Sequence, residues 1–161
     1  VHVHRGTARF ADPHTVRVTR PSPPGGTFDL RAGKVVVAIG STPVRPPVFP
    51  FQHPRVHDSD ELLYITSIPK SLAVIGGGVI GSEYACMFAA LGVRVHLIDG
   101  RDVLLPFLDP DLSKALAAAM GKAGVVFHWK ETVEACRAPS SGEVELRLKS
   151  GAELAVGHVL V

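Results

Sequence analysis

The sequence predicts an α/β fold built on a parallel β-sheet and extended by an antiparallel β-meander. Short apolar runs alternate with helical patterns between residues 71 and 129, and a cluster of glycines, residues 76–78, separates the first run from the first helical pattern. After Glu131, strand-like segments follow one another, separated by turns that contain Ser and Gly. Alternating strands and helices require parallel strands joined by right-handed crossovers, and consecutive strands with tight turns form a meander.

The first 40 residues are predicted to be β-structure. Residues 1–5 and 15–19 alternate apolar and polar side chains, as half-buried strands do. The Pro- and Gly-rich residues 21–26 predict a turn. Residues 34–39 contain the run Val-Val-Val-Ala-Ile, which is typical of a strand buried on both faces.

A connector rich in proline follows, and it predicts a domain boundary. Prolines occupy five positions between residues 43 and 54, a composition that disfavours regular structure. We therefore expect two domains, 1–50 and 51–161, the second with its core starting at about residue 71. Asp58 or Ser59 is expected to cap a short helix over residues 61–63.

The second domain is predicted element by element from its periodicity. Residues 72–75 form a buried strand, residues 79–91 a helix ended by Gly92, and residues 93–98 a second strand. A further helix begins at Asp109 or Asp111 and ends at Gly124, before a third strand. The remaining expected strands cover residues 125–129, 133–137, 144–148 and 154–161.

The glycines form the pattern Gly76-x-Gly78-x-x-Gly81 in the context of a dinucleotide-binding, Rossmann-like βαβ unit. The pattern follows a strand, opens a helix, and is succeeded by Asp99 at the end of the next strand. Gly76 permits the tight turn, Gly78 lets a pyrophosphate approach the backbone, and Gly81 lets the helix pack on the sheet.

The residues around the pattern suggest how a dinucleotide would be held. The helix that begins at Val79 and Ile80 directs free N–H groups towards the phosphates, with Gly77 in the turn before it. Asp99 can accept hydrogen bonds from the adenosine ribose, which favours NAD, whereas Arg101 could pair with the 2′-phosphate of NADP. Two alternatives stay open: a glycine-rich turn that binds nothing, and a methyltransferase-type Rossmann fold.

Composition narrows the possible partners. A net charge of +2 gives no electrostatic case for nucleic acid or an anionic membrane, and no apolar run has the length of a membrane helix. The two cysteines, Cys86 and Cys136, lie far apart and suggest a reduced, cytoplasmic protein. We assign no metal ligand and no catalytic residue. The chain lacks an initiator Met and stops within an apolar run, so we expect a piece of a longer protein.

Two segments resemble a known family. Residues 72–83, Leu-Ala-Val-Ile-Gly-Gly-Gly-Val-Ile-Gly-Ser-Glu, are similar to the NAD(P)-binding segment of the FAD-dependent pyridine nucleotide-disulfide oxidoreductases. Residues 35–43 resemble the second FAD-contacting segment of that family, with Ile39 where threonine is usual. Residues 57–62 and 101–109 are most similar to its soluble, Si-specific transhydrogenase branch.

The resemblance implies a function and further site residues. Residues 1–50 would complete an FAD-binding domain and residues 51–161 would bind NAD(P), in an enzyme that passes hydride between NADPH and NAD through FAD. It would place Glu83 near the nicotinamide and Val133 near the adenine of NAD. The residues expected to contact FAD are Gly6, Thr7, Ala8 and Gly40.

The resemblance also leaves alternatives for the whole protein. It implies a homodimer, and it implies that an FAD glycine fingerprint and any redox dithiol lie before Val1. A dihydrolipoamide dehydrogenase-like disulfide reductase would carry such a dithiol. A non-catalytic NAD(H)-binding module is a second alternative, and we expect residues 1–161 alone to be catalytically inactive.

Overall fold

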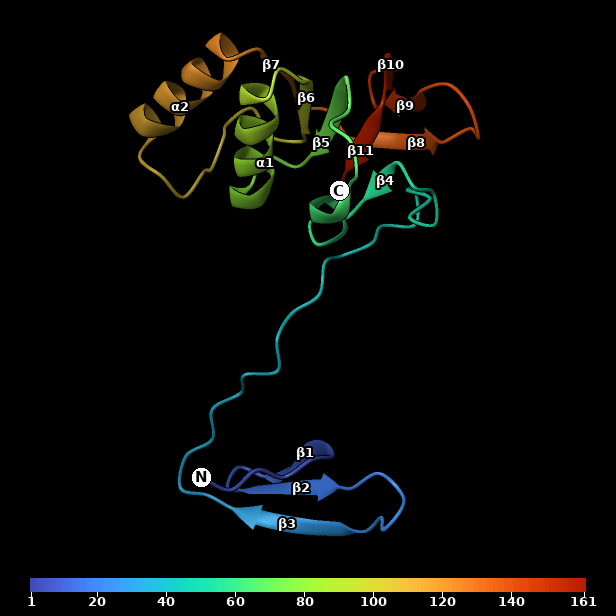
Figure 1. The fold of residues 1–161 in the computed structure, drawn as a ribbon. Coiled ribbons are helices and arrows are strands. Elements are labelled where there is room, and N and C mark those ends of the chain that lie inside the picture. Colours follow the sequence, from blue (N-terminus) through green and yellow to red (C-terminus); the bar gives the residue numbers. More distant parts are fainter. The chain divides into compact units, whose positions relative to one another are not determined.

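A computed structural model describes all residues from Val1 to Val161. The chain forms two compact units, Val1–Ser41 and Thr42–Val161, and each is described by itself (Figure 1). The first unit is a three-stranded sheet. The second contains both α-helices and the parallel sheet.

The first unit is an antiparallel sheet with the order β1-β2-β3. Its strands are β1 (Thr7–Asp12), β2 (Thr15–Thr19) and β3 (Thr27–Arg31). The prediction for residues 15–19 is confirmed, and residues 21–26 do form the link between β2 and β3. The strand predicted over residues 1–5 is wrong, because pairing begins only at Thr7, opposite Thr19.

The strand predicted over residues 34–39 is also wrong. These residues have no regular secondary structure, and the side chains of Val36 and Ile39 are 87% and 89% exposed. A strand buried on both faces needs a hydrogen-bonded neighbour on each side and a layer above and below. The sheet of this unit pairs β1, β2 and β3 with one another and offers residues 34–39 none of these.

The second unit is built on a five-stranded parallel sheet with the order β4-β11-β5-β6-β7. Its strands are β4 (Val56–His57), β11 (His158–Leu160), β5 (Ser71–Ile75), β6 (Arg94–Asp99) and β7 (Val125–Trp129). Helix α1 (Val79–Ala90) connects β5 to β6, and helix α2 (Pro110–Lys122) precedes β7. The predicted order strand-helix-strand-helix-strand is confirmed.

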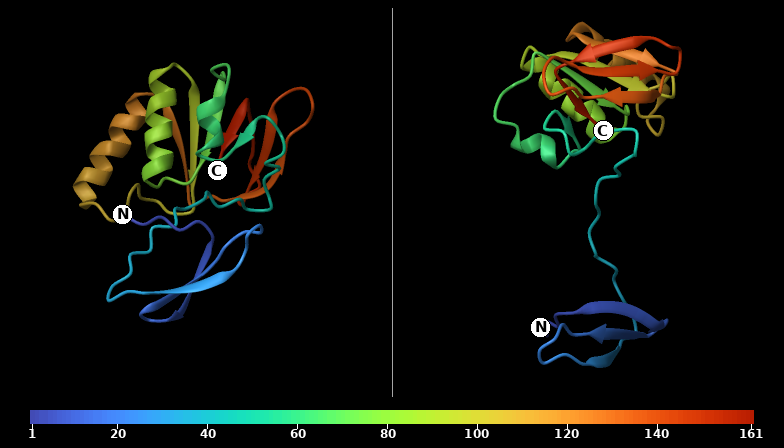
Figure 2. Two further views of the ribbon diagram at one scale, coloured as in Figure 1. Left: turned by 60° about the horizontal axis from the view of Figure 1, so that its bottom comes forward. Right: turned by 90° about the vertical axis from the view of Figure 1, so that its right-hand side faces the viewer.

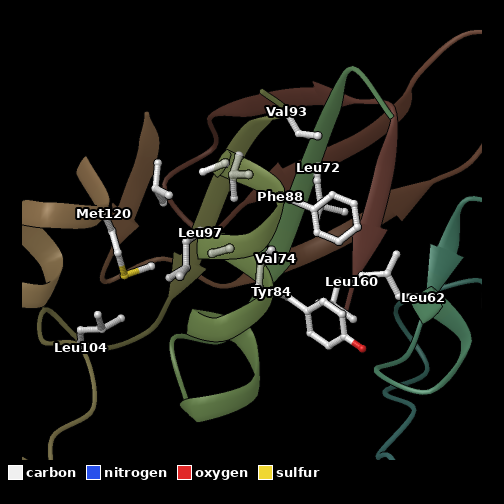
Figure 3. Packing of buried hydrophobic residues seen from close by; sticks show 14 of the residues in the cluster. Leu62, Leu72, Val74, Tyr84, Phe88, Val93, Leu97, Leu104, Met120 and Leu160 are labelled. Carbon is white, nitrogen blue, oxygen red and sulfur yellow. The ribbon is translucent and has the colours of Figure 1, made fainter. Parts of the chain in front are cut away.

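The helices and the meander lie on opposite faces of the parallel sheet, as Figure 2 shows from other directions, and an apolar layer lies on each face. On one face, Tyr84 and Phe88 of α1 and Met120 of α2 pack on Leu72 and Leu97 (Figure 3). On the other face lies the predicted meander: β8 (Val133–Arg137), β9 (Val144–Leu148) and β10 (Glu153–Val156), in the antiparallel order β10-β9-β8. The prediction of a parallel sheet with an antiparallel meander is therefore confirmed.

One predicted strand is in fact two. Residues 154–161 were expected to be continuous, but the chain turns at Gly157, so β10 stays in the meander and β11 joins the parallel sheet beside β5. Gly157 lies against the sheet: its N–H donates to Ser71 Oγ at 2.9 Å, and a Cβ there would be 3.1 Å from the Ser71 carbonyl oxygen. This turn places β11 between β4 and β5 in the parallel sheet.

The predicted start of α2 is confirmed with its cap, whereas the N-cap residue of the short helix is Asp60, which has no side-chain cap, and Asp58 contributes hydrogen bonds from just before it. Asp109 Oδ1 accepts a hydrogen bond from the Asp111 N–H at 2.9 Å, which caps α2. Asp58 Oδ1 accepts from the N–H groups of Asp60 and Glu61, at 3.0 and 2.8 Å, at the start of the 3-10 helix η1 (Glu61–Tyr64). No helix of the protein has the length and apolar character needed to cross a membrane.

Candidate functional site

A turn of glycines joins β5 to α1. Gly76 has a φ of +103°, a conformation that residues with a Cβ rarely adopt, and its N–H donates to the Ile98 carbonyl on β6 at 2.8 Å. Gly81 lies in the first turn of α1, where a Cβ would be 2.0 Å from the Gly76 carbonyl oxygen. Both glycines are therefore needed for the turn to form and for the helix to approach it.

Gly78 differs from these two because nothing in the chain requires a glycine there. A Cβ on Gly78 would meet no atom within 4 Å. Gly78 is the N-cap residue of α1, and no side chain caps this end of the helix. The first N–H groups of a helix have no partner inside it, and the helix dipole favours an anion there. The open space at Gly78 thus lies where a diphosphate could bind.

Asp99, at the carboxyl end of β6, lies beside this turn. Its carboxylate is 6% exposed, and its Oδ2 accepts a hydrogen bond from the Gly77 N–H at 2.6 Å. Its Oδ1 accepts from the Arg101 N–H at 2.8 Å. The Asp99 side chain therefore holds the glycine turn against β6 in addition to any contact with a ligand.

Arg101 covers the same carboxylate. Its Nε donates to Oδ1 at 2.9 Å and its Nη2 to Oδ2 at 2.6 Å, while its own side chain is 45% exposed. The guanidinium lowers the pKa of Asp99 to about 2; burial opposes this, and the N–H groups of Arg101 and Gly77 add to it. Each oxygen of Asp99 already accepts two hydrogen bonds, so a ribose hydroxyl would have to share or replace those of Arg101.

A cavity of about 590 Å³ opens on the other side of the glycine turn, at the carboxyl ends of β5 and β11. Its wall is mostly apolar. The lining residues are Pro43, Val44, Pro46, Ser59, Val74, Ile75, Gly76, Gly78, Val79, Ile80, Gly81, Leu160 and Val161. Because β6 and β11 lie on opposite sides of β5, the turn stands between Asp99 and this cavity. Open α/β sheets bind ligands at such a point, where the strand order reverses.

The structure brings most of the residues predicted to bind a nicotinamide dinucleotide to this one edge of the sheet. Glu83 is exposed on α1 and does not line the cavity. Val133 begins β8 and packs partly into the core between the sheet and the meander, two residues after Glu131, whose N–H donates to the Asp99 carbonyl at 3.1 Å. The roles predicted for Glu83 and Val133 stay predictions.

The residues predicted to contact FAD belong to the unit Val1–Ser41. Thr7 and Ala8 begin β1, opposite Thr19 and Val18, and both are exposed. Gly40 lies outside regular structure with a φ of +78°. Their predicted contacts with FAD stay predictions.

One wall of the cavity was not predicted from the sequence. Pro43, Val44 and Pro46 come from the proline-rich connector, and Leu160 and Val161 come from the end of the last strand. Leu160 and Val161 would have been found if the break at Gly157 had been recognised, since carboxyl ends of neighbouring parallel strands share one edge. No signal in the sequence places the connector beside β5.

The comparisons with known proteins agree with this fold. The sequence model of the pyridine nucleotide-disulphide oxidoreductase family matches residues 1–161. The chain is 43% identical over 155 residues to the soluble pyridine nucleotide transhydrogenase of Pseudomonas paraeruginosa, covering 96% of this chain and 33% of that protein. It is 43% identical over 149 residues to the protein of the same description from Chromohalobacter salexigens, covering 92% and 32%.

A solved structure has a similar fold. The HOCl-induced flavoprotein disulfide reductase RclA from Escherichia coli superimposes with a TM-score of 0.73 and 30% sequence identity, over 96% of this chain and 34% of that one. The chain thus spans about a third of the length of the curated relatives it matches.

Proposed function

Because the chain belongs to the pyridine nucleotide-disulphide oxidoreductase family, we propose that the unit Thr42–Val161 binds a nicotinamide dinucleotide across the glycine turn. One observation carries the proposal: an uncapped helix N-terminus with open space at Gly78 stands between a buried carboxylate and an apolar cavity. A dinucleotide has the matching order of groups, with a sugar bearing hydroxyls, a diphosphate and a second, ring-bearing half.

Each part of the ligand has a place in this arrangement. Asp99 holds the adenosine ribose over β6, and the N–H groups at the start of α1 hold the diphosphate. The nicotinamide half enters the cavity over β5 and β11, where Ile80 and Val44 exclude water from the ring. Glu83, on the same helix, is proposed to lie near the nicotinamide, and Val133 near the adenine.

Arg101 sets which dinucleotides fit. With NAD, the ribose hydroxyls take the place of the guanidinium on Asp99. With NADP, the guanidinium instead pairs with the 2′-phosphate and offsets the repulsion from Asp99. We propose that both NAD and NADP bind at this position, as a transhydrogenase requires.

For the whole protein we propose FAD-mediated, Si-specific hydride transfer between NADPH and NAD, in a cytoplasmic homodimer. The 43% identity to soluble pyridine nucleotide transhydrogenases favours this activity over a dihydrolipoamide dehydrogenase-like reaction and over a non-catalytic NAD(H)-binding module. Bound nicotinamide and flavin rings supply the hydride chemistry, and the protein orients them. Thr7, Ala8 and Gly40 are proposed to contact the FAD.

Calorimetric titration of the 161-residue chain with NAD, NADH, NADP and NADPH tests the dinucleotide site. We expect binding to the native chain and none to Gly78→Val, whose side chain would occupy the space in front of α1, where a Cβ meets no atom of the fold within 4 Å. Asp99→Ala should weaken NAD binding by about 1–3 kcal/mol, the usual loss for a charged hydrogen-bond partner. Equal affinities in the native chain and Gly78→Val would contradict the proposed site.

A further inference from the structure

One wall of the cavity is a segment without regular secondary structure. Pro43, Val44 and Pro46 line the cavity, yet residues 42–46 belong to no helix or strand and five prolines between residues 43 and 54 remove backbone donors. Such a segment keeps a fixed position only through contacts with the rest of the fold. The Pro46 carbonyl accepts a hydrogen bond from the N–H of the buried Phe49 at 3.2 Å, and Arg45, which lies between the lining residues, supplies a charged anchor.

Arg45 makes a charged cluster with two carboxylates of the following segment. Its Nε and Nη2 donate to Asp58 Oδ2 at 2.9 and 2.6 Å, and its Nη2 donates to Glu61 Oε1 at 2.6 Å. The guanidinium also lies over the ring of Phe51, 5.3 Å from the ring centroid. The Asp58 side chain is only 4% exposed, so solvent screens this pair less than an ordinary surface pair.

Asp58 is itself held in place, so the anchor is rigid at both ends. Its Oδ1 accepts from the N–H groups of Asp60 and Glu61, which leaves Oδ2 free for Arg45. Burial alone would raise the pKa of Asp58, but the N–H of Glu61 and the Arg45 guanidinium lower it below its ordinary value, so the carboxylate stays charged. Ser59, the next residue, lines the cavity, and its carbonyl accepts from Tyr84 Oη of α1 at 2.7 Å.

These contacts link the connector, through Asp58, Ser59 and Tyr84, to helix α1, which follows the glycine turn. We propose that Arg45 is a positioning residue: through Asp58 it holds residues 43–46 as the wall against which the nicotinamide half of the dinucleotide packs. This inference rests on the proposed function. It concerns only the half of the ligand beyond the glycine turn, because Asp99 and Arg101 lie on the β6 side, away from the connector wall.

Binding of NADH and of ADP-ribose, compared by calorimetry, tests the proposal. ADP-ribose keeps the adenosine and the diphosphate but lacks the nicotinamide. Arg45→Met should weaken NADH binding by roughly fivefold, because the wall is then ordered only when the ligand binds, and should leave ADP-ribose binding unchanged. Asp58→Asn, which keeps Oδ1 for the N–H groups of Asp60 and Glu61, should show the same selective loss, and Arg45→Lys should restore part of the affinity.

Arg137→Met is the matched control. Arg137 pairs with Glu145 on the meander, with side chains 73% and 52% exposed, and should alter neither affinity. Fluorescence of Trp129, the one tryptophan of the chain, checks that each variant is folded. Equal weakening of NADH and ADP-ribose, or no weakening of either, would overturn the positioning role while leaving the dinucleotide site intact. A native chain that binds neither ligand would overturn the proposed function itself, and this inference with it.

Discussion

Two apolar segments of this protein have nearly the same composition and opposite environments. Residues 35–39 are Val-Val-Val-Ala-Ile, and residues 72–75 are Leu-Ala-Val-Ile. In β5, Leu72, Ala73 and Val74 are fully buried between β11 and β6, whereas Val36 and Ile39 are almost fully exposed. The same pattern thus yields a core strand only where the surrounding chain supplies neighbouring strands and covering layers.

The largest effect expected from this difference is on stability. Leu72→Ala should lower the free energy of unfolding of the second unit by about 3 kcal/mol, because it leaves a cavity between α1 and the sheet. Val36→Ala, at an exposed position, should change stability by less than about 0.5 kcal/mol. Urea unfolding followed by Trp129 fluorescence and far-UV circular dichroism measures both. A cost for Val36→Ala as large as that for Leu72→Ala would show that residues 34–39 are buried after all.

The two units also differ in how deeply their ion pairs are buried, and the cost of breaking each pair should differ accordingly. Arg101→Met should destabilise the second unit by about 1–2 kcal/mol, because the buried Asp99 carboxylate then keeps only two backbone N–H donors. Arg17→Met breaks a pair with Asp29 in which both side chains are 40% exposed, and its cost should be clearly smaller, because solvent screens such a pair. The same unfolding experiment applies. Equal costs would mean that burial of Asp99 does not govern the strength of its pair.

The sequence predicted those parts of the fold that depend on interactions between residues close together in the chain. Strands β5 and β6, helix α1 and the cap of α2 were predicted because their signals are local: apolar runs, glycines and a capping carboxylate. The edge strands of the first unit were not predicted. Phe28 and Leu30 of β3 do alternate with polar residues, but β1 alternates only over residues 7–10, and all six of its residues are exposed.

The candidate site was likewise predicted only in part. The glycine turn and Asp99 were predicted from their spacing, which the βαβ unit fixes. The sequence could not show that Asp99 is engaged by Gly77 and Arg101, because these contacts depend on how the turn folds back on β6. Nor could it show the Arg45–Asp58 pair, which joins residues 13 positions apart across an irregular connector.

A smaller effect concerns pH. Burial, and next the neighbouring His57, lower the pKa of His158 to about 4 from its ordinary 6.5. Between these values the unfolded chain binds a proton that the folded chain does not, so the stability that is complete above pH 6.5 falls as the pH decreases towards 4. The Tm of His158→Gln, followed by Trp129 fluorescence, should fall a few degrees less than that of the native chain from pH 7 to 5. An identical fall in both would mean that His158 protonates as freely in the folded state as in the unfolded one.

The smallest expected effect is a gain of stability beside the glycine turn. Ser82 follows Gly81 on the buried face of α1, and its Oγ is buried without a hydrogen-bond partner. A buried, unpaired hydroxyl is unfavourable, and Ala is the better helix former, so Ser82→Ala should stabilise the second unit by about 0.5–1 kcal/mol. The midpoint of urea unfolding measured through Trp129 should rise accordingly. If the Ser82 hydroxyl contacted a bound ligand, Ser82→Ala would weaken NADH binding. Unchanged NADH affinity in Ser82→Ala would show that the hydroxyl has no role in binding. A loss of stability would instead show that Ser82 has a partner within the folded chain.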